Sequence, residues 1–230
     1  MSIIITVSNQ KGGVGKTTTS AALISGLDQA GKRVLGIDLD PQGNLGFCLG
    51  AGMSSPHTIL DVMNGSVPVH KALVRCDYGD LLVSDITLSN NGLDGIRTNR
   101  EFILRDAIKP VMDFFDYIII DTPPALNLLT VNAYSVSDFL IIPMASDILS
   151  LVGLAQLKET IESVRGSFNP GLNVLGILLT RFNPRTTLSR DVLEMAQQLA
   201  AQINSRVFDT KIRTGVAIAE APAHGESIFS

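Results

Sequence analysis

The chain has 230 residues and a formal charge of −4. With 45% hydrophobic and 17% charged residues, it has enough apolar surface to bury a core, which excludes intrinsic disorder. The acidic balance excludes a protein that is basic throughout, such as a histone-like DNA-binding protein, but it leaves room for a local basic face. No apolar run approaches about 18 residues, so we expect no transmembrane helix.

The cysteines and histidines predict neither a disulfide nor a zinc site. Cys48 and Cys76 have no CxxC spacing, and the N-terminus lacks the basic region and cleavage site of a signal peptide. We therefore expect reduced thiols in a cytoplasmic protein. His57, His70 and His224 show no spacing typical of metal ligands, so we expect them at the surface or in loops.

Short β-rich runs alternate with longer helical stretches along the whole chain. In chain order the pattern predicts a strand at 3–7, a helix at 17–30, a strand at 34–37, a short helix opened by a capping box of Thr58 and Asp61, a strand at 81–83, a helix at 101–115 despite Pro110, strands at 117–120 and 139–142, a helix at 148–165, a strand at 174–179 and a helix at 188–203. This alternation predicts an α/β fold, a mostly parallel twisted sheet flanked by helices on both faces. Ligands of such sheets bind beyond the carboxyl ends of the strands.

A glycine-rich segment separates the first predicted strand from the first predicted helix. Glycines there let successive backbone N–H groups curl around phosphate oxygens, and the N-terminus of the following helix adds partial positive charge. Lys16 is expected to reach the β- and γ-phosphates and the Thr17 hydroxyl to ligate Mg²⁺. A dinucleotide fingerprint is excluded because it needs a third glycine where Thr18 stands. The predicted phosphate-binding residues are Lys11, Gly12, Gly13, Val14, Gly15, Lys16, Thr17 and Thr18.

This loop departs from the ordinary phosphate loop at two positions. Gln10 replaces the first glycine, and Lys11 adds a second lysine. One lysine can satisfy the phosphate oxygens of its own nucleotide, so a second lysine at the outer edge of the loop is placed to project toward another subunit. The alternative is a solvated lysine with no role in the site.

Three aspartates follow predicted strands. Asp121 closes an apolar strand, which would bring its carboxylate to the ligand edge of the sheet, where it can hold Mg²⁺ through water; the alternative is an aspartate in a turn. Asp38 and Asp40 end the second strand, and both lie on one face if the strand continues that far. For Asp40, a capping or turn role before Pro41 is the alternative.

Five segments together resemble the ParA/MinD family of ATPases. They are KGGVGKTT at 11–18, the deviant Walker A motif of that family, GIDLDPQGN at 36–44, IIIDTPP at 118–124, LTRFN at 179–183 and EAPAHG at 220–225. They occur in family order and span almost the whole chain, and they are most similar to the branch of chromosome- and plasmid-partitioning ParA proteins. The resemblance implies a P-loop NTPase fold of the deviant Walker A type, with ATP and Mg²⁺ as cofactors.

The resemblance also implies roles for individual residues. Lys11, Lys16 and Asp40 are the expected catalytic residues: Lys11 enters the site of the partner subunit and touches its phosphates, and Asp40 positions the attacking water. The expected metal-site residues are Thr17, Asp38 and Asp121. Adenine is expected between two segments, Arg181 and Asn183 on one side and Pro222 and Ala223 on the other, although Asn183 and Pro184 also suit a simple turn.

A local basic segment makes DNA a candidate partner. Residues 181–213 carry six basic and three acidic side chains, a local charge of +3, so the rest of the chain carries −7. Such a face can bind DNA phosphates without reading sequence, and the resemblance places the DNA site of ParA proteins in this part of the fold. This chain departs from several relatives, which carry arginine where it reads Val216, Ala217, Ile218 and has no cation. The alternative to a DNA-binding face is a solvated helix face. The candidate DNA-binding residues are Arg185, Arg190, Lys211 and Arg213.

These observations predict an ATP-dependent partitioning or positioning ATPase. ATP would drive a sandwich homodimer that binds DNA, and a ParB-like centromere-binding protein or cargo adaptor would stimulate slow hydrolysis and release it. We expect one ParA-type domain over residues 1–230, which ends before the last helix of the family. We expect the protein in the cytoplasm, on the nucleoid when ATP is bound, and without integral membrane contact. The main alternative is a MinD-like membrane-associated ATPase, which needs a basic amphipathic C-terminal helix. Two further alternatives are a metal-carrier protein and an ATP-dependent synthetase. The chain has no cysteine ligands after the Asp121 strand, which a metal carrier needs, and it shows no evident acceptor motif of a synthetase.

Overall fold

The computed structural model describes residues 2–51, 55–89, 93 and 98–215. At its centre is a seven-stranded sheet with the strand order β3-β4-β2-β5-β1-β6-β7. Every pairing is parallel except that between β3 and β4, which confirms the predicted mostly parallel sheet. The strands are β1 (Ile3–Val7), β2 (Val34–Asp38), β3 (Val74–Arg75), β4 (Asp80–Leu82), β5 (Tyr117–Asp121), β6 (Phe139–Ala145) and β7 (Asn173–Thr180).

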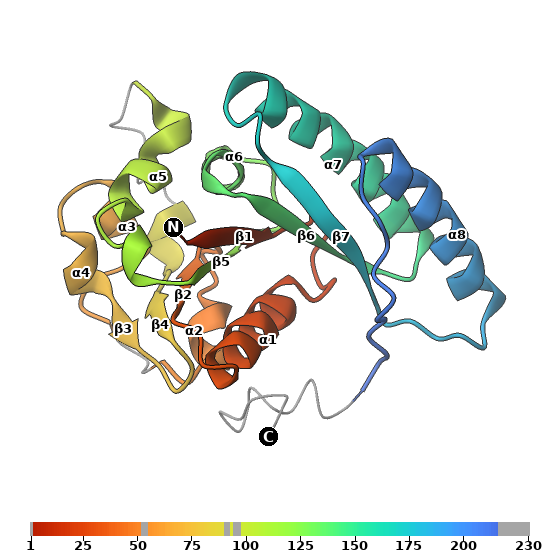
Figure 1. The fold of residues 1–230 in the computed structure, drawn as a ribbon, viewed down its shortest axis with the longest axis horizontal. Helices are drawn as coiled ribbons and strands as arrows, with labels where there is room; N and C mark the ends of the chain where they lie inside the picture. The colour runs from red at the N-terminus through yellow and green to blue at the C-terminus, as the bar shows by residue number, and fades with distance from the viewer. Residues whose placement is uncertain (1, 52–54, 90–92, 94–97, 216–230) are drawn as a thin grey trace.

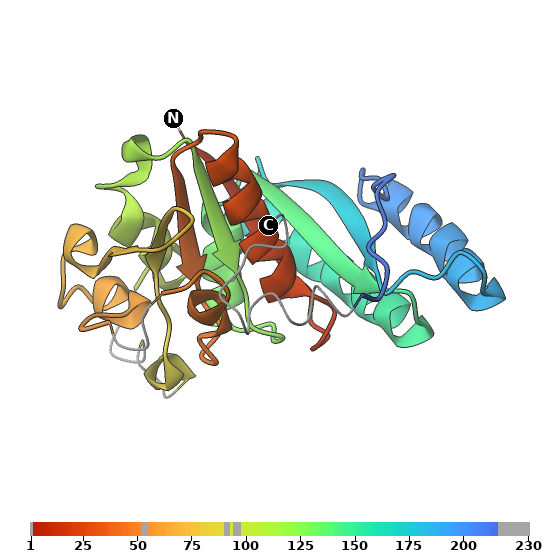
Figure 2. The same ribbon diagram turned by 90° about the horizontal axis from the view of Figure 1, so that it is seen from below.

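Helices cover both faces of this sheet, as Figures 1 and 2 show. One face carries α1 (Lys16–Gln29) and α2 (Asn44–Cys48), and the other carries α6 (Leu128–Val136), α7 (Ile148–Ser167) and α8 (Thr187–Gln202). The smaller helices α3 (Ile59–Met63), α4 (Val69–Ala72) and α5 (Ile103–Ile108) lie toward the β3 end of the sheet (Figure 1). The described part of the chain also forms the short 3₁₀ helices η1 (Ile86–Ser89), η2 (Arg100–Phe102) and η3 (Met112–Phe114).

The central strands are apolar because they are buried on both faces. Ile118, Ile119 and Ile120 of β5 are all fully buried, although successive side chains of a strand point to opposite faces. Their neighbours form two hydrophobic clusters, one on each face of the sheet. The continuous apolar runs in the sequence therefore correspond to strands covered by helices on both sides.

The predicted elements differ from the structure in a few places. The predicted helix 101–115 is wrong as a single helix, because α5 ends at Ile108, just before Pro110, and 3₁₀ turns flank it. Proline has no N–H to donate and clashes with the preceding turn. The sequence pattern did not predict α2, α4, α6 or the two-residue β3. The capping box of Thr58 and Asp61 is confirmed at the start of α3.

An extended segment covers the outer edge of β7. The Ile177 N–H donates to the Arg206 carbonyl oxygen at 2.8 Å, the Phe208 N–H to the Ile177 carbonyl oxygen at 2.9 Å, and the Ile212 N–H to the Leu179 carbonyl oxygen at 2.8 Å. The Phe208 ring lies directly against Gly176, where a Cβ would come within 2.6 Å of the ring. The segment thus satisfies backbone groups that an exposed edge strand would leave open.

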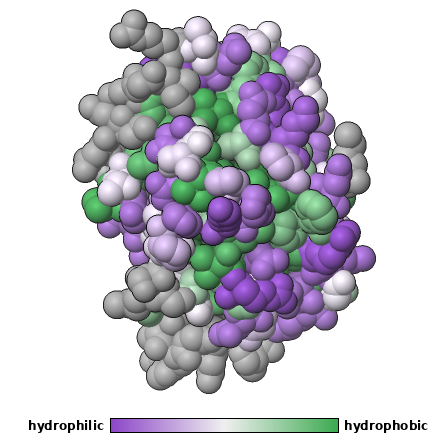
Figure 3. Space-filling model, turned by 90° about the vertical axis from the view of Figure 1, so that its left-hand side faces the viewer, coloured by the Kyte–Doolittle hydropathy of each residue, from purple (hydrophilic) through white to green (hydrophobic). Residues whose placement is uncertain are grey.

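The surface over α3, α4 and α5 mixes hydrophilic and hydrophobic residues (Figure 3). Among the residues that the structure describes, no helix has the length and apolar character needed to cross a membrane.

Gly176→Ala should destabilise the protein by about 1–3 kcal/mol, because the added methyl must displace the Phe208 ring. Urea unfolding measures the loss. The matched control is Gly166→Ala in α7, where a Cβ would meet nothing within 4 Å and where alanine should stabilise the helix by about 0.5–1 kcal/mol. Equal stability of Gly176→Ala and the wild type would show that Phe208 is not held against β7.

Candidate functional site

The glycine-rich loop lies between the end of β1 and the start of α1, at the carboxyl edge of the sheet. Gly13 (φ 71°) and Gly15 (φ 90°) have left-handed backbone conformations that a side chain would strain. Gly15 is the N-cap residue of α1, and no side chain of the described residues caps this helix. Its first N–H groups and the positive end of its dipole are therefore available to an anion, and phosphate binding there stays a prediction.

Lys16 is buried in the loop. Its Nζ donates to the Lys11 carbonyl oxygen at 3.1 Å. Burial lowers the pKa of Lys16, and the negative charges of Asp121 and Asp40 act in the opposite direction. An ammonium group held on a loop carbonyl beside two carboxylates is placed to transfer to the phosphates of a nucleotide.

Lys11 is held within its own chain. Its Nζ lies 2.7 Å from both carboxylate oxygens of Asp147 and 3.3 Å from the Ser150 hydroxyl. Asp147 is also the N-cap of α7, where it accepts a hydrogen bond from the Ser150 N–H at 2.8 Å. Partial burial acts to raise the pKa of Asp147, but the hydrogen bonds from Lys11 and Ser150 outweigh it and the pKa is lowered. The role of Lys11 in a partner subunit stays a prediction.

Asp121 is fully buried at the end of β5. Its Oδ1 accepts a hydrogen bond from the Ser20 hydroxyl at 2.9 Å, while Oδ2 has no hydrogen-bond partner among the described residues. Burial raises the pKa of Asp121 to about 6, against the effects of the nearby Thr17 hydroxyl, the hydrogen bond from Ser20 and the charge of Lys16, which lower it. A buried carboxylate oxygen without a partner, beside a threonine hydroxyl, fits a divalent cation with oxygen ligands.

Asp38 and Asp40 are not two positions on one face of a strand, because β2 ends at Asp38. Asp38 is fully buried and accepts backbone hydrogen bonds from Asp40 at 2.9 Å and from Leu45 at 3.1 Å, so it fixes the turn into α2. Burial and the charge of Asp121 hold the pKa of Asp38 well above its ordinary value. Asp40 accepts a hydrogen bond from the Gln42 N–H at 3.0 Å. This contact fits the turn role that was the alternative for Asp40.

The end of β7 forms the other wall of the loop. The Thr180 hydroxyl donates to the Val14 carbonyl oxygen at 3.0 Å. Arg181 has a left-handed φ of 52°, and its Nη2 lies 3.8 Å from the position that a Cβ on Gly13 would take. The structure therefore brings Arg181 to the phosphate loop rather than away from it.

Asn183 forms the turn considered as its alternative role, since its Oδ1 accepts the Arg185 N–H at 3.1 Å. Pro222 and Ala223, predicted on the other side of adenine, and His224 lie outside the described residues, as do Val216, Ala217 and Ile218. An adenine site between the two segments stays a prediction.

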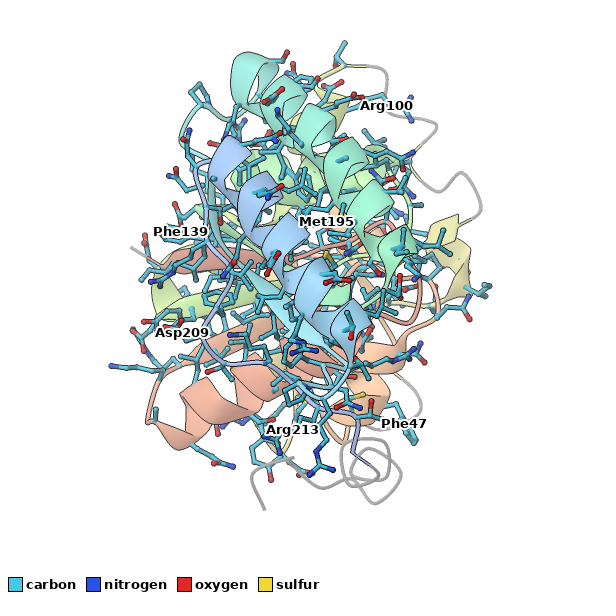
Figure 4. All side chains as sticks on the ribbon, turned by 90° about the vertical axis from the view of Figure 1, so that its right-hand side faces the viewer. Phe47, Arg100, Phe139, Met195, Asp209 and Arg213 are labelled. Atoms are coloured by element: carbon cyan, nitrogen blue, oxygen red, sulfur yellow. The ribbon has the colours of Figure 1, made fainter. Side chains whose placement is uncertain are left out.

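The candidate DNA-binding residues lie around the start of α8 and in the segment beyond it. Arg185 and Arg190 are exposed, and Arg190 donates to the Thr187 hydroxyl at 3.5 Å. The Lys211 Nζ donates to the Asp209 carbonyl oxygen at 3.1 Å. Figure 4 shows Arg213 below the N-terminal end of α8, with Met195 on the outer face of that helix.

Sequence reasoning did not assign roles to several side chains that support the loop. Asn9 is almost fully buried; its Nδ2 donates to the Pro143 carbonyl oxygen at 2.7 Å and its Oδ1 accepts the Lys11 N–H at 2.9 Å. Thr180, Ser20 and Asp147 were not assigned either. Thr180 lies within the LTRFN motif and Asn9 lies two residues before the KGGVGKTT motif, whereas no local pattern links Asp147 to a loop 136 residues earlier.

The raised pKa of Asp121 predicts a pH dependence of stability. Between the unfolded value of 3.8 and the folded value of about 6, Asp121 binds more protons in the folded chain than in the unfolded chain, so its contribution to the free energy of unfolding should rise as the pH falls through 6. Without nucleotide or Mg²⁺, moving from pH 7.5 to pH 5 should therefore raise the Tm of the wild type by about 3 °C relative to Asp121→Asn.

Thermal unfolding at the two pH values checks this expectation. Because the charge of Asp121 also raises the pKa of Asp38, Asp121→Asn changes the titration of Asp38 as well, and the difference between the two proteins reports this coupled pair. Exposed Asp191→Asn in α8 is the control and should follow the wild type. An identical pH response of Asp121→Asn and the wild type would contradict the expected titration.

Comparisons with known proteins agree with these features. The family described as AAA domain matches residues 2–174. The chromosome partitioning protein ParA of Caulobacter vibrioides is 40% identical over 232 residues, which cover 98% of this chain and 86% of that protein. The sporulation initiation inhibitor protein Soj of Bacillus subtilis is 38% identical over 233 residues, covering 100% of this chain and 91% of Soj.

A similar solved structure comes from a protein with a different name. Cobyrinic acid a,c-diamide synthase from Mycobacterium smegmatis, with bound ADP and magnesium, is 37% identical, with a TM-score of 0.86 over 97% of this chain and 93% of that chain. The family match spans well over half of the chain, and the two curated relatives span nearly all of it. The chain therefore belongs to the ParA/MinD family of deviant Walker A ATPases.

Proposed function

We propose that this chain is a partitioning ATPase whose ATP-bound form dimerises and binds DNA without reading sequence, and that a ParB-like protein or cargo adaptor stimulates hydrolysis and release. As a family member the chain is an ATPase, with ATP and Mg²⁺ as its cofactors. The observation that carries the proposal is the loop after β1, where Lys11, Lys16 and the buried Asp121 carboxylate come together at the ends of parallel strands.

Each group in the loop has a task that its geometry supports. The open N–H groups at the start of α1 bind phosphate oxygens, and Lys16 leaves the Lys11 carbonyl oxygen to join them. Thr17 and Asp121 hold Mg²⁺, and Asp38, behind them, keeps the turn into α2 in place. Bound Mg²⁺ neutralises phosphate charge. Asp40, half-buried beside Lys16, orients the attacking water.

The start of α7 supports dimerisation. Ile148, Leu149 and Val152 are 62%, 72% and 54% exposed, and they follow directly on Asp147, the intrachain partner of Lys11. Exposed apolar side chains of this size, gathered on one turn of helix, are typical of an interaction surface. In the proposed dimer Lys11 leaves Asp147 and reaches the phosphates of the second subunit, which neutralises negative charge between two nucleotides.

Two variants separate nucleotide binding from hydrolysis. Lys16→Ala should abolish ATP binding, because it removes the cation of the loop, whereas Asp40→Ala should bind ATP, accumulate as a dimer and lose most of its hydrolysis. Isothermal titration, analytical ultracentrifugation with Mg²⁺ and ATP, and phosphate release are the measurements. Lys32→Ala, exposed just beyond the far end of α1, is the matched control. Unchanged ATP affinity of Lys16→Ala, or normal hydrolysis by Asp40→Ala, would reject the assigned role.

The basic residues around α8 support DNA binding. We expect the double variant Arg185→Ala, Arg190→Ala to weaken ATP-dependent DNA co-sedimentation by about tenfold at low salt, with the ATP dimer intact, because it removes phosphate contacts. The control for charge alone is the pair of substitutions Lys32→Ala and Arg75→Ala, at two exposed positions away from α8. Equal DNA binding by the double variant and the control would place the DNA site elsewhere.

The same assay with anionic liposomes tests the membrane alternative. ATP-dependent sedimentation with DNA and not with liposomes supports the partitioning role, and the reverse result supports a MinD-like role. Sedimentation with neither, together with ATP turnover that depends on a small acceptor, would favour a synthetase. The partitioning role implies a location in the cytoplasm, and on the nucleoid when ATP is bound. We propose one ParA-type domain over residues 1–230.

A further inference from the structure

Thr180, the last residue of β7, joins the sheet to the phosphate loop. It is 7% exposed, and its hydroxyl donates to the Val14 carbonyl oxygen at 3.0 Å. Its own carbonyl oxygen accepts hydrogen bonds from the Ser146 N–H and the Ser146 hydroxyl, both at 3.2 Å. Thr180 is therefore fixed from the β6 side, and its hydroxyl is a rigid anchor for one particular carbonyl of the loop.

That carbonyl belongs to the peptide between Val14 and Gly15. The C=O and N–H of a trans peptide point in opposite directions. Because the Val14 carbonyl oxygen is turned toward Thr180, the Gly15 N–H is turned away from β7. Gly13 and Gly15, on either side of Val14, both have positive φ angles, and glycine allows many backbone orientations. The loop backbone therefore needs an outside contact to hold this peptide in one orientation.

We propose that Thr180 is a positioning residue for nucleotide binding: its hydroxyl holds the Val14–Gly15 peptide so that the Gly15 N–H faces the phosphates. This inference rests on the proposed nucleotide site at the loop. Thr180 acts on the nucleotide only through the backbone of the loop, and this distinguishes it from Lys16 and Thr17, which are proposed to touch phosphate or metal.

The side chain of Thr180 suits this role in both of its branches. The hydroxyl satisfies the Val14 carbonyl oxygen, and Cγ2 lies 3.7 Å from the position that a Cβ on Gly15 would take, an ordinary van der Waals contact. Valine would keep the methyl packing and the β-branched shape but could not donate a hydrogen bond. Serine would keep the hydroxyl and lose only the methyl group.

Three variants test the proposal by titration of Mg²⁺ and ADP into the full chain. Thr180→Val should weaken ADP binding about tenfold, the effect of one lost hydrogen bond on the loop. Thr180→Ser should bind within about twofold of the wild type, because the anchor is restored. Ser205→Ala removes a hydrogen bond to the Val174 carbonyl oxygen at the opposite end of β7, away from the loop, and it should bind ADP like the wild type.

Turnover supplies a second readout that a merely structural role would not move. At saturating ATP, Thr180→Val should hydrolyse at nearly the wild-type rate with a raised KM, since Thr180 lies outside the reacting groups. Wild-type affinity of Thr180→Val, or Thr180→Ser as weak as Thr180→Val, would overturn the proposal. If Thr180→Val does not fold, Thr180→Ala removes the same hydroxyl and is compared with Thr180→Ser in its place. Failure of the wild type to bind ADP or ATP would instead reject the nucleotide site itself.

Discussion

The parallel pairing of β1 with β5 on one side and β6 on the other is the constraint on which the site depends. It places the ends of these strands next to one another, and β7 pairs with β6 up to Thr180, with one register shift between Leu140 and Ile141. The loop that leaves β1 is therefore bordered by Asp121 from β5, by Asp147 beyond β6 and by Thr180 from β7. A loop rich in glycine has little conformational preference of its own, so its shape comes from these neighbours.

Asn9 and Thr180 hold the loop through buried polar contacts rather than through packing. After β1 the ladder to β6 ends with the bond from the Ser8 N–H to the Ile141 carbonyl oxygen at 3.1 Å, and the side chain of Asn9 then replaces the backbone as donor to Pro143. Thr180 provides the matching contact on the far side of the loop. Buried hydrogen bonds of this kind are specific in direction, and an apolar contact would leave the loop free to rotate its peptides.

The sequence predicted features that neighbouring residues determine, and it missed contacts between residues that are far apart in the chain. Apolar runs predicted the core strands, and the phosphate loop and Asp121 were predicted because strand, glycines and charged residues adjoin one another. Helix α6 was missed because its residues are apolar or small on nearly every side and show no helical period, and a proline split the helix predicted at 101–115. The bonds of Lys11 to Asp147 and of Thr180 to Val14 join residues 136 and 166 positions apart, which no pattern in a single sequence records.

The intrachain contact of Lys11 is compatible with a role in a second subunit because it is weak and replaceable. The side chains of Lys11 and Asp147 are 31% and 40% exposed, and ion pairs this open to water contribute about 0–1 kcal/mol. Several phosphate oxygens offer a lysine more negative charge than one carboxylate does. Asp147 keeps its bond to the Ser150 N–H when the lysine leaves, so α7 remains capped and its exposed apolar residues stay in place. The exchange then alters the charge at the proposed interface without altering the fold that presents it.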